Sequence, residues 1–323
     1  MSKNLLEFLQ EFLEHLEIEK NRSPKTLQNY EFYVNRFIEW FGDKKPEKIN
    51  LEEVRKYRIW LNRLEDVHGD PLKNNTQNYH LIALRSFLKY LAKRDVKTLT
   101  PEKIELMKMP DRDITFLEAS DLNRILEAPE KHLKTQQTKN PKVSRTTKLI
   151  AYRDKSILEM LFSTGLRVSE LAKLKKENVN VKRDEFTVKG KGQKSRIVFL
   201  SEQAKHWVKK YIAERNDMNP YLFISHNPNK TGEKIEHAPI TPRSIQRLTE
   251  KYGKLAGITK QVTPHTLRHS YATDLLRNGA DIRSVQIMLG HTSITTTQIY
   301  THISDRELKS VYKKFHNKDK ESG

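Results

Sequence analysis

The stretch Thr263-Pro264-His265-Thr266-Leu267-Arg268-His269 decides how the C-terminal half of this chain is interpreted. Threonine is a good N-cap and proline suits the first helical position, so a helix is predicted to begin at Pro264. His265 and Arg268 are three residues apart and therefore share a face near the positive end of that helix. A helix start that carries an imidazole and a guanidinium favours an anionic ligand.

Two further polar motifs follow this helix in the sequence. A second helix is predicted from about Asp281 to Leu289, with Gly290 as its C-cap, and it delivers His291 just past its end. Tyr300 then closes the run Thr295-Thr296-Thr297-Gln298-Ile299-Tyr300. Two imidazoles, a guanidinium and a phenol brought together suit a phosphate, because fixed donors stabilise its added negative charge while a hydroxyl attacks.

The order of these residues resembles the C-terminal signature of the tyrosine recombinase (phage integrase) family, and the layout is most similar to its short bacterial and archaeal Xer type. Four active-site positions of that family fall within this stretch: His265, Arg268, His291 and Tyr300. A single His-x-x-Arg pair is a weak motif, whereas the ordered combination is a strong one. The resemblance therefore implies a site-specific recombinase that cuts and rejoins DNA.

The remaining positions of the family's active site are expected upstream. Arg167, in Thr164-Gly165-Leu166-Arg167, matches the first catalytic arginine. Glu170 matches the acidic position and would orient Arg167 or a histidine, although a plain surface carboxylate is the alternative. Lys191, in the glycine-rich hairpin Gly190-Lys191-Gly192-Gln193-Lys194, matches the catalytic lysine better than Lys189 or Lys194 does. A nonspecific phosphate contact is the alternative for this lysine.

The resemblance implies a reaction that agrees with the chemistry of these side chains. A phenol with a pKa of about 10 needs help to lose its proton, so His265 would accept the proton of Tyr300 as it attacks phosphorus. Three side chains would donate hydrogen bonds to the transition state: Arg167, Arg268 and His291. Lys191 would give a proton to the leaving 5′-oxygen. A 3′-phosphotyrosyl intermediate keeps the bond energy, so no ATP or other cofactor is expected. Because arginines take the place of an ion, no metal is expected either.

Other functions stay open at this point. His265, His269 and His291 could be zinc ligands, since His-x-x-x-His is a helical metal spacing, but Arg268 beside them argues against a cation. A DNA-binding regulator of the same fold would not need Tyr300. A type IB topoisomerase would share the chemistry, but the short chain with a separate helical N-terminal domain favours a recombinase.

Composition limits the class of protein. A chain of 323 residues predicts two domains, and a net charge of +19 with a pI near 9.7 predicts a polyanionic partner. Residues 1–112 contribute +3 and residues 113–323 contribute +16. The chain has no cysteine and no apolar run long enough to span a bilayer, so we expect a cytoplasmic protein without disulfides or membrane contact.

The predicted fold is mainly α. Residues 1–100 are expected to form a four-helix domain whose aromatic residues build a core, and the resemblance makes it the core-binding (SAM-like) DNA-binding domain. Its helices are predicted at about 4–19, from Ser23 to near Gly42, at 51–65, and from Thr76 to about Arg94. Residues 101–115, with scattered prolines and mixed charges, are the predicted linker.

Residues 116–323 are the predicted catalytic domain, a mixed α/β unit that is mostly helical. A short helix is expected to end at Pro129, and a buried helix to run into Gly165. Three short strands would form a small antiparallel sheet, and two more helices would follow: strands at about 178–182, 185–189 and 195–199, helices at about 201–216 and 242–256.

Two basic segments are candidates for DNA contact. Residues 131–148 contain six lysines and arginines and no acid, which predicts a solvated loop or a DNA-touching arm; its candidate residues are Lys134, Lys139, Lys142 and Arg145. Arg243 and Arg247 lie one turn apart on the helix at 242–256. In the family this region approaches the major groove, although both arginines could simply be solvated.

The tail after Tyr300 predicts an assembly. Residues 305–315 place four apolar side chains on one helical face: Leu308, Val311, Tyr312 and Phe315. This face either folds back on its own domain or, as the resemblance implies, docks on a neighbouring protomer in a homotetramer on double-stranded DNA that carries a specific recombination site. Strand exchange would pass through a Holliday junction. A second recombinase or an accessory protein is a further candidate partner, and the task is chromosome-dimer resolution or mobile-element integration and excision.

Overall fold

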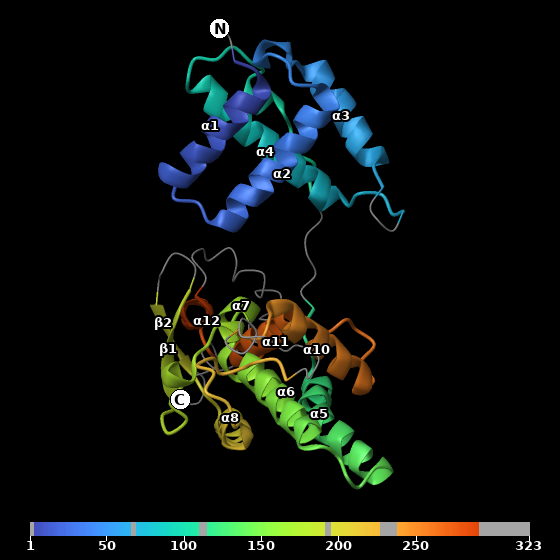
Figure 1. The fold of residues 1–323 in the computed structure, drawn as a ribbon, viewed down its shortest axis with the longest axis vertical. Helices are drawn as coiled ribbons and strands as arrows, with labels where there is room; N and C mark the ends of the chain where they lie inside the picture. The colour runs from blue at the N-terminus through green and yellow to red at the C-terminus, as the bar shows by residue number, and fades with distance from the viewer. Residues whose placement is uncertain (1–2, 66–68, 110–114, 191–194, 227–237, 291–323) are drawn as a thin grey trace, which may run out of the picture. The chain divides into compact units, whose positions relative to one another are not determined.

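The computed structural model describes residues 3–65, 69–109, 115–190, 195–226 and 238–290. The chain divides into two compact units, Met1–Arg112 and Asp113–Gly323 (Figure 1). Across the described ranges, no helix combines the length and the apolarity that crossing a bilayer requires. Each unit has its own hydrophobic core.

The N-terminal unit contains the four predicted helices: α1 (Leu5–Ile18), α2 (Pro24–Phe41), α3 (Leu51–Arg63) and α4 (Asn74–Ala92). The turn η1 (Pro46–Lys48) lies between α2 and α3, and the turn η2 (Pro101–Lys103) follows α4. Ser23 caps α2 and Asn50 caps α3, since their side chains accept from backbone N–H groups three residues on. The predicted start of the fourth helix, with Thr76 as its cap, is wrong: α4 begins at Asn74, because the N–H of Thr76 already bonds to the carbonyl of Lys73.

Aromatic rings fill the core of this unit. Phe37 and Tyr57 are completely buried and meet edge to face with ring centroids 5.0 Å apart, and Phe12 contacts Phe87 at 5.5 Å. These contacts confirm that the aromatic positions of the helices build the core. Phe32 and Tyr79 are different, because about half of each side chain is exposed.

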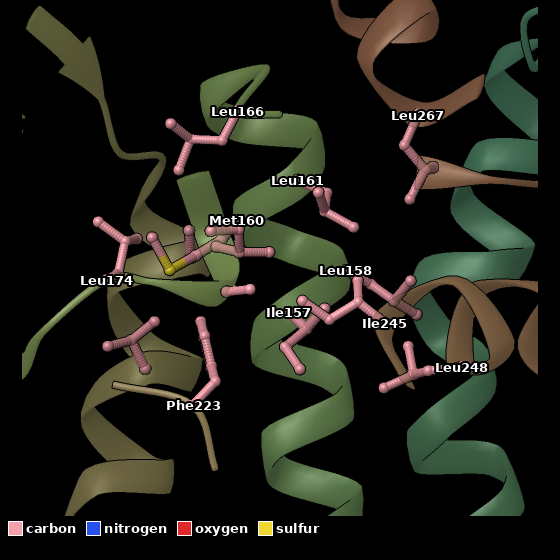
Figure 2. Packing of buried hydrophobic residues seen from close by; sticks show 14 of the residues in the cluster. Ile157, Leu158, Met160, Leu161, Leu166, Leu174, Phe223, Ile245, Leu248 and Leu267 are labelled. Atoms are coloured by element: carbon pink, nitrogen blue, oxygen red, sulfur yellow. The ribbon is translucent and has the colours of Figure 1, made fainter. Parts of the chain in front are cut away.

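The C-terminal unit, called the catalytic unit after the prediction made for residues 116–323, is built around α6, as Figures 1 and 2 show. Its elements in chain order are α5 (Ala119–Lys139), α6 (Arg145–Thr164), α7 (Val168–Ala172), η3 (Lys176–Asn178), β1 (Glu185–Lys189), β2 (Ser195–Phe199), α8 (Glu202–Glu214), α10 (Pro242–Leu255), α11 (Pro264–Arg277) and α12 (Ile282–Leu289). Met160 points toward Leu174 and Phe223 on one side of α6, while Leu158 points toward Ile245 on the other. Because α6 is enclosed in this way, its apolar residues are buried around most of its circumference.

The sheet is smaller than predicted. β1 and β2 pair in antiparallel fashion from Glu185 with Phe199 to Lys189 with Ser195, and no third strand joins them among the described residues. The predicted strand at 178–182 is wrong. The side chain of Asn180 accepts from the N–H of Lys182 and its carbonyl from Arg183, so a turn replaces the strand.

The helix predicted to end at Pro129 continues for ten residues beyond it, to Lys139. Proline removes one helical hydrogen bond, but Ala128, Pro129 and Leu133 are buried against the unit, and this packing sustains the helix. Most of residues 131–148 therefore lie in α5 and at the start of α6, not in a loop. We call the segment 130–150 the α5–α6 hairpin.

Gly165 ends α6 as predicted, with a left-handed φ of +58°. A Cβ atom at this position would lie only 2.5 Å from Cδ1 of Tyr271. Both the backbone conformation and the close approach of α11 therefore require glycine.

We predict that Gly165→Ala lowers the free energy of unfolding of the catalytic unit by about 2–4 kcal/mol, since it adds left-handed strain to overpacking. Gly279→Ala is the matched control, because Gly279 has a φ of +88° but no atom within 4 Å of a Cβ. The control should cost about 1 kcal/mol. Denaturant unfolding measures both, and equal losses would contradict the steric argument.

Candidate active site

The helix α11 begins as predicted. Thr263 is its N-cap and accepts a hydrogen bond from the N–H of Thr266 at 3.2 Å, and Pro264 follows in the first turn. His265 lies at the surface, whereas Arg268 is buried with 4% of its surface exposed. A guanidinium buried this deeply needs acceptors within the protein.

The C-terminal end of α12 supplies acceptors to three arginines. The last carbonyls of a helix lack intrahelical partners and carry partial negative charge. Three successive carbonyls each accept from a different arginine: Met288 from Nε of Arg196 at 3.0 Å, Leu289 from Nη2 of Arg268 at 2.7 Å, and Gly290 from Nη2 of Arg167 at 3.0 Å. We call Arg167, Arg196 and Arg268 the arginine cluster.

Arg268 also donates through Nη1 to the carbonyl of Gly165. This bond ties α11 to the end of α6, two residues before Arg167. The left-handed turn at Gly165 thus sets the position of two members of the arginine cluster at once.

Glu170 is the anionic centre of the cluster. Its carboxylate accepts from the backbone N–H and Nη1 of Arg167, both at 2.9 Å, and from Nη1 and Nη2 of Arg196 at 3.1 and 2.7 Å. Burial alone would raise its pKa, but the hydrogen bonds from Arg196 and Arg167 lower the pKa of Glu170 to about 2. Glu170 is therefore a buried carboxylate that orients Arg167, not a surface residue.

Arg196 was missed by the sequence analysis. Its side chain is only 7% exposed and bridges Glu170 to the end of α12. Strand periodicity places Arg196 on the same face of β2 as the buried Val198, which is the one sequence signal that could have identified it. Gly290, with a φ of +63°, makes room for this arginine, since a Cβ there would lie 2.9 Å from Cδ of Arg196.

The two histidines of α11 favour their neutral forms. Burial, together with the charges of Arg268 and Arg167, lowers the pKa of His265 below its usual 6.5. Burial, His265 and Arg268 lower the pKa of His269 to about 4. At pH 7 both imidazoles are thus uncharged, and His265 at the surface can accept a proton.

An open cavity of about 800 Å³ lies beside Arg167 and Glu170. Its wall also contains Lys173, Lys175 and Lys189, so its rim is rich in cations. Such a cavity suits a polyanion that presents one group to Arg167.

Three predicted active-site residues, Lys191, His291 and Tyr300, lie outside the described residues, as does the tail at 305–315. Gly190 and Ser195, which flank the segment containing Lys191, line the cavity beside Arg167. In the parts of the chain that the structure describes, no group of three or more His, Cys, Asp or Glu side chains could hold a metal.

The candidate DNA-binding residues lie on other elements than the arginine cluster. Arg243 and Arg247 are exposed on α10, and Nη1 of Arg243 donates to Gln246 at 3.2 Å. In Figure 1 the connected ends of α5 and α6 extend away from α7, α11 and α12. The lysines of this hairpin are exposed: Lys134, Lys139 and Lys142.

Arg145 has a structural contact. Its Nη2 donates to the carbonyl of Glu214 at 3.1 Å and to Oδ1 of Asn216 at 2.9 Å. This arginine therefore attaches the α5–α6 hairpin to the end of α8.

Comparison with known proteins decides the family. Residues 115–307 match the model of the phage integrase family, and residues 9–95 match that of the phage integrase N-terminal SAM-like domain. The chain belongs to the phage integrase family. It is 33% identical over 323 residues to tyrosine recombinase XerC of Thermodesulfovibrio yellowstonii, covering 97% of both chains. It is also 33% identical to tyrosine recombinase XerD of Staphylococcus haemolyticus, covering 95% of this chain and 98% of the relative.

Solved structures share the fold of this phage integrase family member. The XerH site-specific recombinase bound to difH substrate, in a pre-cleavage complex, matches 94% of this chain and 82% of its own with a TM-score of 0.65 and 21% identity. The Tn1549 transposon integrase in complex with transposon right end DNA matches 96% of this chain and 99% of its own with a TM-score of 0.69 and 17% identity. The mainly helical fold with a small antiparallel sheet is confirmed as that of a tyrosine recombinase.

We predict that Glu170→Gln destabilises the catalytic unit of this tyrosine recombinase at neutral pH. Because the folded pKa of Glu170 is about 2 against an ordinary 4.5, its stabilisation is complete above pH 4.5 and is lost as the pH falls toward 2. The difference in unfolding free energy between wild type and variant should be at most about 3 kcal/mol at pH 7 and shrink over this range. Denaturant unfolding at several pH values measures it, and a constant difference would contradict the pairing.

Proposed function

We propose that this tyrosine recombinase acts on double-stranded DNA at a specific site, with Tyr300 as the nucleophile and a 3′-phosphotyrosyl intermediate. The observation that supports this most is the arginine cluster, which fixes Arg167 and Arg268 at one helix end directly before His291 in the sequence. Preorganised guanidinium groups stabilise the charge of a phosphoryl transition state without reorganising during the reaction.

Arg167 and Arg268 bind the nonbridging oxygens of the scissile phosphate. Arg167 uses Nη1 and Nη2 for Glu170 and Gly290 and keeps further N–H groups for a ligand. The cationic cavity beside it gives the phosphate access. His291 is assigned a further hydrogen bond to the same oxygens.

Proton transfer accompanies the exchange of one ester for another. The phenol oxygen of Tyr300 forms a bond to phosphorus while the bond to the 5′-oxygen breaks, and His265 takes the phenol proton. The lowered pKa of His265 supports this role, since a base must be neutral before it accepts. Lys191 gives a proton to the leaving 5′-oxygen. Because an ester replaces an ester, no ATP is needed. Because Arg167 and Arg268 stabilise the charge at phosphorus, no metal is needed.

The two units divide the work of DNA binding in this proposal. Residues 1–100 form the core-binding domain, 101–115 the linker and 116–323 the catalytic domain, which carries most of the positive charge. Arg243 and Arg247 contact the major groove, and the lysines of the α5–α6 hairpin contact phosphates. The protein acts in the cytoplasm on chromosome dimers or on a mobile element.

We predict that Tyr300→Phe keeps DNA affinity and abolishes the covalent protein–DNA adduct, because it removes only the attacking oxygen. The adduct is measured on a nicked suicide substrate, with wild type in EDTA as the control that should still react. An adduct formed by the variant would contradict the assignment of Tyr300 as the nucleophile. Wild-type cleavage that EDTA abolishes and zinc restores would support the metal site instead. If the wild-type protein relaxed supercoils without joining two sites, the result would favour a topoisomerase. If the wild-type protein bound DNA but formed no adduct, the result would favour a regulator.

The assembly we propose is a homotetramer on two DNA sites, with the tail of each protomer docked on its neighbour and exchange through a Holliday junction. A cavity of about 730 Å³ between α5, α6, α8 and α11 supports this. Its wall contains Trp207 and four carboxylates: Glu127, Glu130, Glu159 and Asp274. Lys155 pairs with Glu130 and Glu159, and Lys131 pairs with Glu127. The tail interleaves lysines with its apolar residues and would compete for these carboxylates through Lys309, Lys313 and Lys314. A head-to-tail contact of this kind closes into a ring.

We predict that deletion of residues 305–323 preserves binding of one protomer to a half-site, reduces cooperative filling of the second, and abolishes recombination. Glu127→Lys, at the exposed edge of the cavity, should weaken cooperativity in the same direction. Gel-shift titration and a recombination assay measure both. Full cooperativity in the truncated protein would refute docking on a neighbour, and a failure to fold would place the tail in its own core.

A further inference from the structure

The N-terminal unit carries an exposed surface that its core does not explain. Phe32 on α2 and Tyr79 on α4 keep 51% and 47% of their surface exposed, and Ile82 keeps 39%. Tyr33 links them, with ring centroids 5.4 Å from Phe32 and 6.3 Å from Tyr79. We call Phe32, Tyr33, Tyr79 and Ile82 the aromatic face. Contiguous exposed apolar surface of this kind marks an interaction site.

Arg36 borders the aromatic face and is fixed from two sides. Its guanidinium carbon lies 4.6 Å from the centre of the Phe32 ring, and Nη1 lies 3.4 Å from Nε2 of His80. His80 is 1% exposed, and its Nδ1 lies 2.9 Å from the carbonyl oxygen of Thr76. Because a carbonyl only accepts, Nδ1 carries the proton and Nε2 is the acceptor for Arg36.

A guanidinium fixed in this way is ready to bind an acceptor. Its orientation is set before the ligand arrives, which reduces the conformational entropy lost on binding. The two contacts described for it, a ring and a neutral imidazole, carry no negative charge. Arg94 offers the contrast within the same unit: it also lies over a ring, Tyr90, at 4.7 Å, but two carboxylates lie within 4 Å of it, those of Glu11 and Glu19.

The residues around Arg36 fit duplex DNA. A row at helical spacing along α2 holds two cations, an amide and a ring: Lys25, Asn29, Phe32 and Arg36. Glu39 continues this row. Asn75, Tyr79 and Ile82 form a second row on α4, close to its partially positive N-terminal end. Guanidinium and amide groups bind phosphates and base edges, and apolar side chains contact thymine methyl groups.

We propose that Arg36 contacts DNA from the N-terminal unit, and that His80 and Phe32 are positioning residues that aim its guanidinium at a phosphate oxygen or a guanine edge. This inference rests on the proposed function, because it takes duplex DNA as the ligand. It adds to the proposed core-binding domain one named DNA contact, Arg36, and the two side chains that position it.

The test measures DNA affinity in the full chain with Tyr300→Phe, so that cleavage does not interfere. The probe is the duplex recovered by binding-site selection with that protein. Arg36→Gln should weaken binding about 5- to 100-fold, whereas the matched control Arg94→Gln should change it less than about 3-fold. If the variant loses affinity uniformly across sequences and its salt slope is smaller by about 1, Arg36 binds a phosphate. If it loses affinity only at one base position, Arg36 binds a guanine.

His80 requires a readout that a merely structural residue would not affect. His80→Leu should weaken binding in the parent protein and cause no further loss when Arg36 is already Gln, because both changes remove one interaction. Unfolding curves for each variant ensure that folded proteins are compared. Additive losses would overturn the positioning role.

Other outcomes separate this inference from the proposed function. Arg36→Gln that binds as tightly as its parent would overturn the inference while leaving the recombinase assignment intact. If Arg36→Gln bound one half-site normally but lost cooperativity on two half-sites, the inference would also be overturned, because the aromatic face would then contact protein and not DNA. A selection that recovers no duplex would overturn both proposals.

Discussion

The rest of the catalytic unit depends on the end of α12. Three carbonyls that the helix cannot satisfy accept from three arginines, and these arginines come from the start of α7, from β2 and from α11. An unpaired buried carbonyl and an unpaired buried guanidinium are each costly, so each stabilises the position of the other. The small sheet matters mainly because β2 carries Arg196 into this contact.

Among the described residues, the contacts of the arginine cluster contain more positive than negative charge. Arg167 and Arg196 share the carboxylate of Glu170, and all three guanidinium groups donate to one helix end that carries partial negative charge. The remaining positive potential contributes to the lowered pKa of His265, whose causes include the charges of Arg268 and Arg167. A bound phosphate would complete the balance of charge, which is why the arrangement suits a reaction that adds negative charge to phosphorus.

Arginines in this protein are fixed in two chemically different ways. Arg167 is oriented by a carboxylate and a carbonyl, which hold it firmly and offset part of its charge. Arg36 is oriented by a buried neutral imidazole and an aromatic ring, which leave the charge available. The first arrangement suits a group that must act on one atom, and the second suits a surface that attracts a polyanion.

The sequence by itself determined the local features. The caps at Ser23, Thr263 and Asp281, and the left-handed turns at Gly165 and Gly290, follow from interactions among residues a few positions apart, and all were found where the sequence placed or allowed them. The order of His265, Arg268, His291 and Tyr300, with Arg167 and Lys191 upstream, was also sufficient to indicate the family. Tertiary structure decided the rest. It buried Arg196, carried α5 through Pro129, used Arg145 to fasten the α5–α6 hairpin, and replaced a predicted strand by a turn at Asn180. Arg167 and the carbonyl that it binds are 123 residues apart, and no local propensity encodes a contact over that distance, because it exists only once the core has packed.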